Sequence, residues 1–367
     1  ETTEETNLIA NKIDLNAEKN IHLNGEMKAL ELNVEAETIV SEADLLAINA
    51  LAINAKKEAI FKNSAIGATN ADIKTIELEI LNASFNAPTL SIETEKTLIE
   101  NATIEVNDLT FNLGDAITNN FKLFSEIATI NYENWNDNNS QWNIGKLALS
   151  GKKLTSQNGS WLFNDGSINA TDLILKESTL FSYNANITAA NLSSNNSAIY
   201  TEKLTLTISQ ALKSIGDRWR ILPFSEQSEI LDAGTLKLTA AASEFTGSVI
   251  QADNLLLNSG RSQFSQTDVF TNTISIEGNE LVTDTDSLWV ANNSVNLSTT
   301  ITDLNHAIKT SNIQLEATKA DLSGRWLIAE NSTINSATSL NIAGLELSAD
   351  SLIMSFEDGV WDDLVIK

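Results

Sequence analysis

Short runs in which apolar and polar residues alternate recur along almost the whole chain. Examples are Leu204-Thr205-Leu206, Leu236-Lys237-Leu238 and Ile274-Ser275-Ile276. Alternation with a period of two is typical of a β-strand that buries one face. A strand of three or four residues buries only two side chains, so a core forms only when many such strands stack. The pattern therefore predicts an all-β protein made of many short strands.

The spacing of related segments indicates how these strands are connected. The positions of Trp142 and Trp161 differ by 19, and Leu236, Leu255 and Ile274 follow one another in steps of 19. A spacing near 19 is the length of one coil of a three-sided β-solenoid. Proline and glycine are scarce, at 2 and 15 residues, which favours parallel strands with Asn, Ser and Asp at the corners over tight hairpins. We therefore predict an elongated parallel β-helix, or β-solenoid, with coils of roughly 20 residues.

A few segments depart from this alternation and predict short helical insertions. In the clearest one, the apolar residues Leu212, Ile215, Trp219 and Leu222 are three or four positions apart, and Pro223 follows. The predicted insertions cover residues 115–127, 209–222 and 300–309.

The same features predict how the chain is organised. We expect an N-terminal tail over residues 1–12, an Ala/Asn-rich solenoid segment over 13–130, a Trp-containing solenoid segment over 131–208, a helical insertion over 209–231 and a further solenoid segment over 232–367.

Composition excludes several classes of partner. The 367 residues are 42% hydrophobic, which is enough for a sizeable core, and the net charge is −26. An acidic surface repels phosphate backbones and anionic lipid head groups, so we expect no nucleic-acid partner. No run of 18 apolar residues is present, so no transmembrane segment is predicted. The absence of cysteine, together with abundant Asn, Thr and Ser, fits an exported bacterial protein at the cell surface, with the periplasm as the alternative.

No catalytic pattern stands out. His22 and His306 lie near opposite ends of the chain, and their neighbours do not show the spacing of metal ligands, so we interpret them as ordinary surface or corner residues. Acidic pairs such as Asp284/Asp286 and Asp362/Asp363 are expected by chance in a chain with 49 carboxylates. We therefore predict a protein that is not an enzyme and that uses no cofactor or metal.

Two short segments combine a cation with an aromatic ring. They are Arg218-Trp219-Arg220 and Gly324-Arg325-Trp326. Stacking of Arg on Trp is a way to hold a saccharide or a protein partner. We therefore name Arg218, Trp219, Arg220, Arg325 and Trp326 as candidate surface contacts; the alternative is that each pair covers an edge of the core.

The arrangement of short apolar runs along the chain resembles that of two protein families. The segments from Leu173-Ile174-Leu175 to Leu192 and from Ser339-Leu340-Asn341-Ile342 to Ile353 resemble the coils of filamentous-haemagglutinin-type secreted β-helix adhesins. That resemblance implies a rigid surface stalk or filament with contact residues on its lateral faces.

A second resemblance, to AsmA-like envelope proteins, rests on the strand at Lys203–Ile208, the segment that follows it, and residues 358–366. It implies an open β-groove that carries lipid. Alternation alone is the same for a closed solenoid and an open groove.

These observations predict a non-enzymatic extracellular structural or adhesive protein that forms a rigid β-rod or filament on the cell surface. The alternatives are an AsmA-like lipid carrier and a carbohydrate-active β-helix enzyme. We expect self-association, end to end or laterally, and a glycan or cell-surface receptor as a partner.

Overall fold

The computed structural model describes residues 6–225, 228 and 230–367. The chain is a parallel β-solenoid with about 19 coils of roughly 19 residues each, and 87% of it lies in strands. The described residues contain no helix. The predicted fold class and coil length are therefore confirmed.

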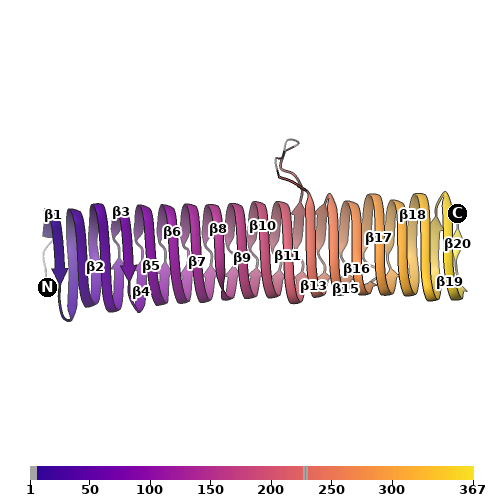
Figure 1. Ribbon diagram of the computed structural model, residues 1–367, viewed down its shortest axis with the longest axis horizontal. Helices are drawn as coiled ribbons and strands as arrows, with labels where there is room; N and C mark the ends of the chain where they lie inside the picture. The colour runs from indigo at the N-terminus through magenta and orange to yellow at the C-terminus, as the bar shows by residue number, and fades with distance from the viewer. Residues whose placement is uncertain (1–5, 226–227, 229) are drawn as a thin grey trace. The chain divides into compact units, whose positions relative to one another are not determined.

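The chain divides into two units, residues 1–174 and 175–367, within each of which successive strands wind as coils (Figure 1). The strands of the first unit are β1 (Thr6–Asn16), β2 (Asn20–Lys62), β3 (Ala65–Lys74), β4 (Glu77–Leu81), β5 (Ser84–Glu100), β6 (Thr103–Asn119), β7 (Lys122–Asn138), β8 (Gln141–Gln157) and β9 (Ser160–Lys176), which ends just past the division. The strands of the second unit are β10 (Thr179–Asn195), β11 (Ala198–Ile215), β12 (Arg218–Ile221), β13 (Thr235–Thr246), β14 (Val249–Ala252), β15 (Asn254–Ser265), β16 (Asp268–Thr283), β17 (Leu288–Asn305), β18 (Ala307–Ser348), β19 (Ser351–Asp362) and β20 (Val365–Ile366).

Each coil has three sides, as β5 shows. Its alternation of buried and exposed residues is interrupted twice by two adjacent outward residues, at Pro88-Thr89 and at Glu95-Lys96. These interruptions are two corners, and the third corner is Asn101, directly after the strand. The next coil repeats the same arrangement, so Leu90 pairs with Leu109 and Leu109 with Ala128 in parallel register.

Asparagine forms the third corner throughout the regular part of the first unit. Residues 63, 82, 101, 120, 139 and 158 are all Asn, with φ between 50° and 53°. Asn tolerates this left-handed conformation because its short polar side chain bonds locally. The side chain of Asn101 donates to Oδ1 of Asn82 at 3.2 Å, and its backbone N–H donates to the carbonyl of Asn119 at 2.9 Å. Each corner is therefore bonded to the coils on both sides.

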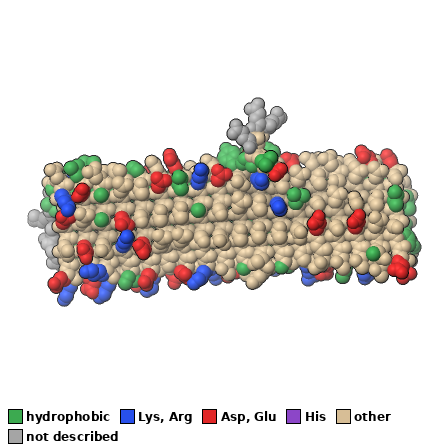
Figure 2. Space-filling view, in the orientation of Figure 1, with side chains coloured by type: hydrophobic (Ala, Val, Ile, Leu, Met, Phe, Trp, Pro, Cys, Tyr) green, Lys and Arg blue, Asp and Glu red, His purple; other side chains and the backbone are tan. Residues whose placement is uncertain are grey.

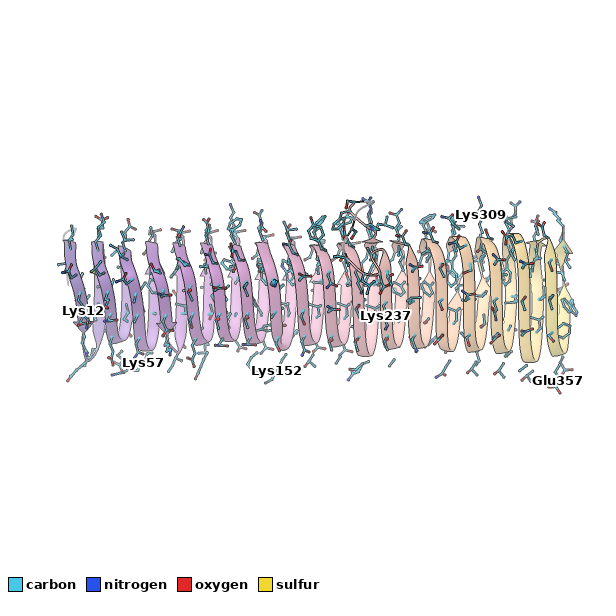
Figure 3. The ribbon with its side chains drawn as sticks, turned by 45° about the horizontal axis from the view of Figure 1, so that its top comes forward. Lys12, Lys57, Lys152, Lys237, Lys309 and Glu357 are labelled. Atoms are coloured by element: carbon cyan, nitrogen blue, oxygen red, sulfur yellow. The ribbon has the colours of Figure 1, made fainter. Side chains whose placement is uncertain are left out.

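Inward residues fill the interior of the coils. In the first unit the rings of Trp142 and Trp161 stack at 4.7 Å, and Trp135 lies 5.0 Å from Trp142. All three are buried. Most charged side chains take outward positions; Figure 3 shows Lys57 and Lys152 pointing away from the coils. The alternation read from the sequence thus separates core from surface.

The predicted helical insertions are wrong, because all three segments are strand interrupted only by corners. Residues 115–127 run from β6 into β7, residues 300–309 run from β17 into β18, and residues 209–221 belong to β11, a corner and β12. Two or three adjacent outward residues at a corner shift the alternation and produce apparent helical spacing. In β11 these residues are Ser209, Gln210 and Ala211.

The segment predicted as a helical insertion over 209–231 therefore contains strands and then a loop that leaves the coils between β12 and β13 (Figure 1). The predicted N-terminal tail is also largely strand, since residues 6–12 belong to β1, and residues 1–5 lie outside the described residues.

Candidate binding surfaces

The first unit has an open groove along the corner that contains Glu95. Its volume is about 910 Å³. Residues of successive coils on both sides of this corner line it, because the same corner recurs in neighbouring coils. At Gly114 the backbones of two coils approach so closely that an added Cβ would lie 2.1 Å from the carbonyl oxygen of Glu95. The coil-to-coil repeat thus places residues of several successive coils, between Asn54 and Asn134, along one groove.

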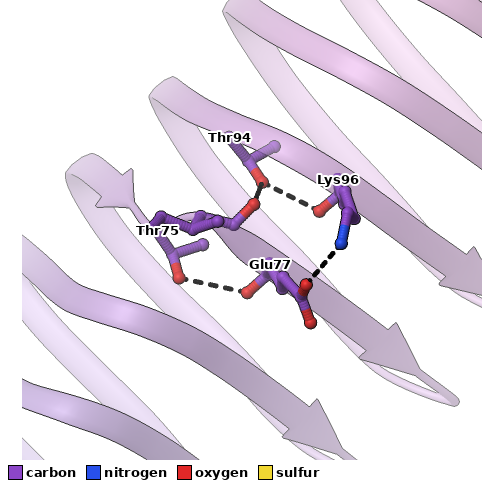
Figure 4. A network of polar contacts seen from close by, with 5 residues as sticks. Thr75, Glu77, Thr94 and Lys96 are labelled. Atoms are coloured by element: carbon purple, nitrogen blue, oxygen red, sulfur yellow. Dashed lines mark hydrogen bonds and ion pairs between the residues drawn. The ribbon is translucent and has the colours of Figure 1, made fainter.

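Threonine hydroxyls hold the backbone at one end of this groove (Figure 4). Thr94 Oγ1 donates to the carbonyls of Ile76 and Lys96, at 3.0 and 2.9 Å, and Thr75 Oγ1 donates to the carbonyl of Glu77 at 3.0 Å. Lys96 Nζ donates to Glu77 at 2.7 Å, and this contact raises the pKa of Lys96. Because both partners of the ion pair are exposed, it adds little stability.

The walls of the groove are acidic and amide-rich. Glu93, Glu95, Asp115 and Glu133 line it together with one cation, Lys74. Amide side chains form a ladder here: Asn131 Nδ2 donates to Asn112 Oδ1 at 2.9 Å, and Asn134 Nδ2 donates to Asp115 Oδ1 at 2.7 Å. Such a surface repels anions and offers hydrogen bonds to polyols or cations. The described residues contain no group of three or more His, Cys, Asp or Glu side chains able to hold a metal ion.

The second unit has its surface feature at the loop between β12 and β13. The side chain of Glu202 is buried beneath this loop and holds it. Glu202 Oε1 accepts from the backbone N–H of Phe224 at 2.7 Å, and Oε2 accepts from the hydroxyl of Ser228. The backbone carbonyl of Glu202 accepts from Gly234 at 2.6 Å. Lys203 Nζ donates to the carbonyl of Leu231 at 3.0 Å, so two neighbouring residues fix both ends of the loop.

Aromatic rings gather where the loop begins. Phe224 folds back onto β10 and stacks on Phe181 with ring centroids 4.6 Å apart. Tyr183 packs edge-on against Phe224 at 5.4 Å. Phe224 and Tyr183 stay 39% and 43% exposed, so each ring has a face open to solvent. Figure 2 shows the resulting group of hydrophobic side chains at the base of the loop.

The five candidate contact residues differ in exposure. Arg218, Arg220 and Arg325 are exposed, but the indoles of Trp219 and Trp326 point into the interior and are at most 1% exposed. Trp219 and Trp326 are therefore not surface contacts, and no Arg–Trp stack of these segments lies on the surface. Alternation explains this, because neighbours in a strand face opposite sides. That Arg218, Arg220 and Arg325 contact a saccharide or a protein partner stays a prediction.

Sequence reasoning missed Glu202 and the ring cluster on the loop. The sign of an insertion is a break in the coil length. Lys203 pairs with Thr235 in the next coil, which is many more residues away than the usual 19. The inserted residues follow β12 and begin with Leu222-Pro223-Phe224, a segment that the spacing of apolar residues wrongly predicts to be helical.

Each unit also buries a carboxylate beside tryptophan. In the first unit, Asp137 accepts from Thr118 Oγ1 at 2.6 Å and from Trp161 Nε1 at 3.1 Å. In the second, Asp217 accepts from Ser214 Oγ at 2.6 Å, and Trp219 Nε1 donates to that hydroxyl at 3.0 Å. Burial raises the pKa of Asp137 and of Asp217. These carboxylates lie in the interior and bind the coils together.

His306 lies at the corner between β17 and β18, one of the two positions predicted for it, but its side chain is buried in the core, so its interpretation as a surface residue is wrong. The imidazole is 1% exposed and lies 4.5 Å from the ring of Trp289. Its Nδ1 is 2.6 Å from Thr283 Oγ1, and Nε2 has no partner among the described residues. Burial lowers the pKa of His306 to about 3, which keeps the ring neutral. His22, in contrast, is exposed, as the sequence predicts.

In comparisons with known proteins, no protein family, curated protein or solved structure matches this chain. The described part of the chain holds no helix with the length and apolarity needed to cross a membrane. The fold and the two surfaces therefore carry the functional argument.

Proposed function

We propose that this chain is a non-enzymatic structural or adhesive protein of the extracellular surface. The observation that carries the proposal is the bonding between coils within each unit. In the first unit, β5, β6, β7 and β8 pair along their whole length with the same register. In the second, β15, β16 and β17 continue such pairing across successive coils. A body of this kind resists bending and presents its lateral faces to partners.

The lateral faces support an adhesive role more than a catalytic one. The groove of the first unit and the loop surface of the second are both open to solvent, and both lie on rigid strands. Binding residues are often carried in this way, on loops and faces positioned by a stiff scaffold. The absence of cysteine fits an exposed location, where thiols are liable to oxidation.

The lipid-carrying alternative receives no support from the interior. A groove for acyl chains needs apolar side chains that stay open to a ligand. Here the inward residues, among them Phe111 and Leu123 in the first unit and Leu204 in the second, are buried from solvent.

Single-molecule force spectroscopy tests the structural role. The full chain is attached at its two ends and stretched. We expect discrete unfolding steps with distinct force peaks, because many strand ladders must break together before a coil is released. Smooth extension without force peaks would contradict the proposal.

Self-association, lateral or end to end, is part of this proposal, because open strand edges pair with other strands. Sedimentation velocity over a range of concentrations measures it. Larger species that grow with concentration support association, and a single species at every concentration contradicts it.

A further inference from the structure

One outer face of the second unit combines aromatic rings with arginine. It is formed by residues 179–182, 198–201, 218–221 and 249–252, at the starts of β10, β11, β12 and β14. Phe181 pairs in register with Tyr200, and Tyr200 pairs with Arg220. The flanking residues of each are buried, so all three side chains point outward. Neighbouring strands are about 4.8 Å apart, so these side chains form a ladder with one member per coil.

This face is positively charged in an acidic chain. Arg218 and Arg220 are both on β12, with Trp219 between them, and both are exposed. Neither forms an ion pair with a described residue, whereas Arg261 and Arg325 pair with Glu280 and Glu346. The remaining outward positions of the four segments are Thr, Ala, Val and Gln, so these described segments carry no outward carboxylate; the nearest one along the coils is Asp268, which pairs with Val249. The whole chain has a net charge of −26, so two neighbouring exposed arginines without a paired carboxylate on a described residue stand out from the rest of the surface.

Phe224, at the start of the segment between β12 and β13, adds a ring to this face and is held in place. Phe224 stacks on Phe181 and contacts Tyr183, while the buried carboxylate of Glu202 holds the backbone N–H of Phe224. Rings that are already packed against one another lose little conformational entropy when a ligand binds. We call this the ring–arginine surface, made of Phe181, Tyr183, Tyr200, Arg218, Arg220 and Phe224.

We propose that the ring–arginine surface binds an anionic polysaccharide through its carboxylate or sulfate groups. The guanidinium group forms paired hydrogen bonds with such planar or tetrahedral anions, and exposed aromatic rings pack against the apolar faces of sugar rings. The spacing of the ladder, about 4.8 Å, is comparable to the length of one hexose unit in an extended chain. The inference rests on the proposed adhesive function and names its ligand class.

A nucleic acid or an anionic membrane fits less well. Both present a dense array of negative charge, which the rest of this acidic surface repels. A polysaccharide with one anion per sugar meets the two arginines and lies along the rings with weaker repulsion.

Biolayer interferometry on the immobilised full chain tests the proposal with three probes: polygalacturonate, which carries carboxylates, chondroitin sulfate, which also carries sulfates, and neutral dextran. We expect binding of at least one anionic probe and none of dextran, with affinity that falls as ionic strength rises. The double variant Arg218→Gln/Arg220→Gln should weaken binding about ten-fold or more, because charge-assisted hydrogen bonds are lost. The matched control Arg261→Gln, an exposed arginine of the same unit that lies outside this surface, should change affinity less than about two-fold.

Two further variants separate shape from charge. Arg218→Lys/Arg220→Lys keeps the charge but loses the paired geometry, so its affinity should lie between those of the wild type and the Gln variant. Phe224→Ala should weaken binding several-fold. Both arginine variants change only exposed side chains, and circular dichroism verifies that they keep the β signal.

The proposal is overturned if no anionic probe binds, if dextran binds equally well, or if the double variant and the Arg261→Gln control behave alike. Force peaks that persist in the stretching experiment alongside any of these results would leave the structural role standing and reject only the ligand.

Discussion

Both units bury inward side chains between stacked coils, but the coils of the first unit are more uniform in length and in corner residue than those of the second. In the first, β5 to β9 are strands of 17 residues each, with Asn at the left-handed corner after β5, β6, β7 and β8. In the second, β11 has one extra residue, Gly216 and Gly247 take over that corner, and the segment between β12 and β13 interrupts a coil. Pairing nevertheless resumes beyond the loop, with Lys203 opposite Thr235. The inward positions therefore define the coil, and the corners accept insertions.

This difference indicates where recognition is located. The regular unit offers a uniform groove, whereas the irregular unit builds a distinct surface at its insertion. If both units depend on the same packing of inward side chains and differ only at their corners, variants at inward positions should have similar effects in both units.

The largest effect is expected from removing a stacked indole. Trp142 lies between Trp135 and Trp161, so Trp142→Ala should destabilise the fold by about 3–5 kcal/mol, and Trp289→Ala in the second unit by a similar amount. Urea unfolding followed by circular dichroism measures both. Trp361→Ala, at a residue 43% exposed, is the control and should cost much less. A negligible effect of Trp142→Ala would show that the interior does not depend on this stack.

The loop should open locally without loss of the coils. Glu202→Ala removes an acceptor from Phe224 N–H and from Ser228, and charge-assisted bonds contribute about 1.5–3 kcal/mol each. Limited proteolysis should cleave the variant faster within residues 222–234, while the unfolding midpoint changes little. Unchanged cleavage would contradict the role assigned to Glu202.

Acid should weaken the second unit through His306. Its folded pKa of about 3 lies below the unfolded value of about 6.5, so the unfolded state binds more protons between these values and stability falls as pH decreases from 6.5. At pH 5 the loss is about 2 kcal/mol relative to pH 7.5. His306→Phe should remove this component, as measured by urea unfolding at both pH values. An identical pH dependence in the variant would show that His306 is not the responsible group.

A smaller effect is expected at the corners. Asn101→Ala places a residue with no local bonding group at φ 51°, which should cost about 1–2 kcal/mol. Asn101→Gly should be close to neutral, because glycine adopts this conformation freely and already occupies the equivalent corner at Gly216. Thermal unfolding of the two variants compares them, and equal destabilisation would show that side-chain loss matters more than conformation.

Much of the fold could be predicted from the sequence because alternation reports directly on which side chains face inward. The step between Trp142 and Trp161 also gave the coil length. The helical predictions failed for a physical reason: at a corner two or three outward residues follow one another, so Leu212 and Trp219 acquire helix-like spacing although both are buried in strands.

The candidate sites were less predictable. Arg218 and Arg220 were identified from their residue types, but the rings that accompany them come from Phe181, Tyr200 and Phe224, which are distant in sequence. Only the register between coils brings them together. A single sequence with irregular coils does not reveal that register, nor the anchoring of the loop by Glu202.

The in-register stacking of successive coils is most directly measured by electron paramagnetic resonance. Because the chain has no cysteine, nitroxide labels can be attached at cysteines introduced at Thr110 and Thr129, exposed residues that pair in neighbouring coils. The two labels should be close enough for strong dipolar broadening of the spectrum, compared with either single label alone. A doubly labelled spectrum equal to the sum of the single-label spectra would contradict the stacking.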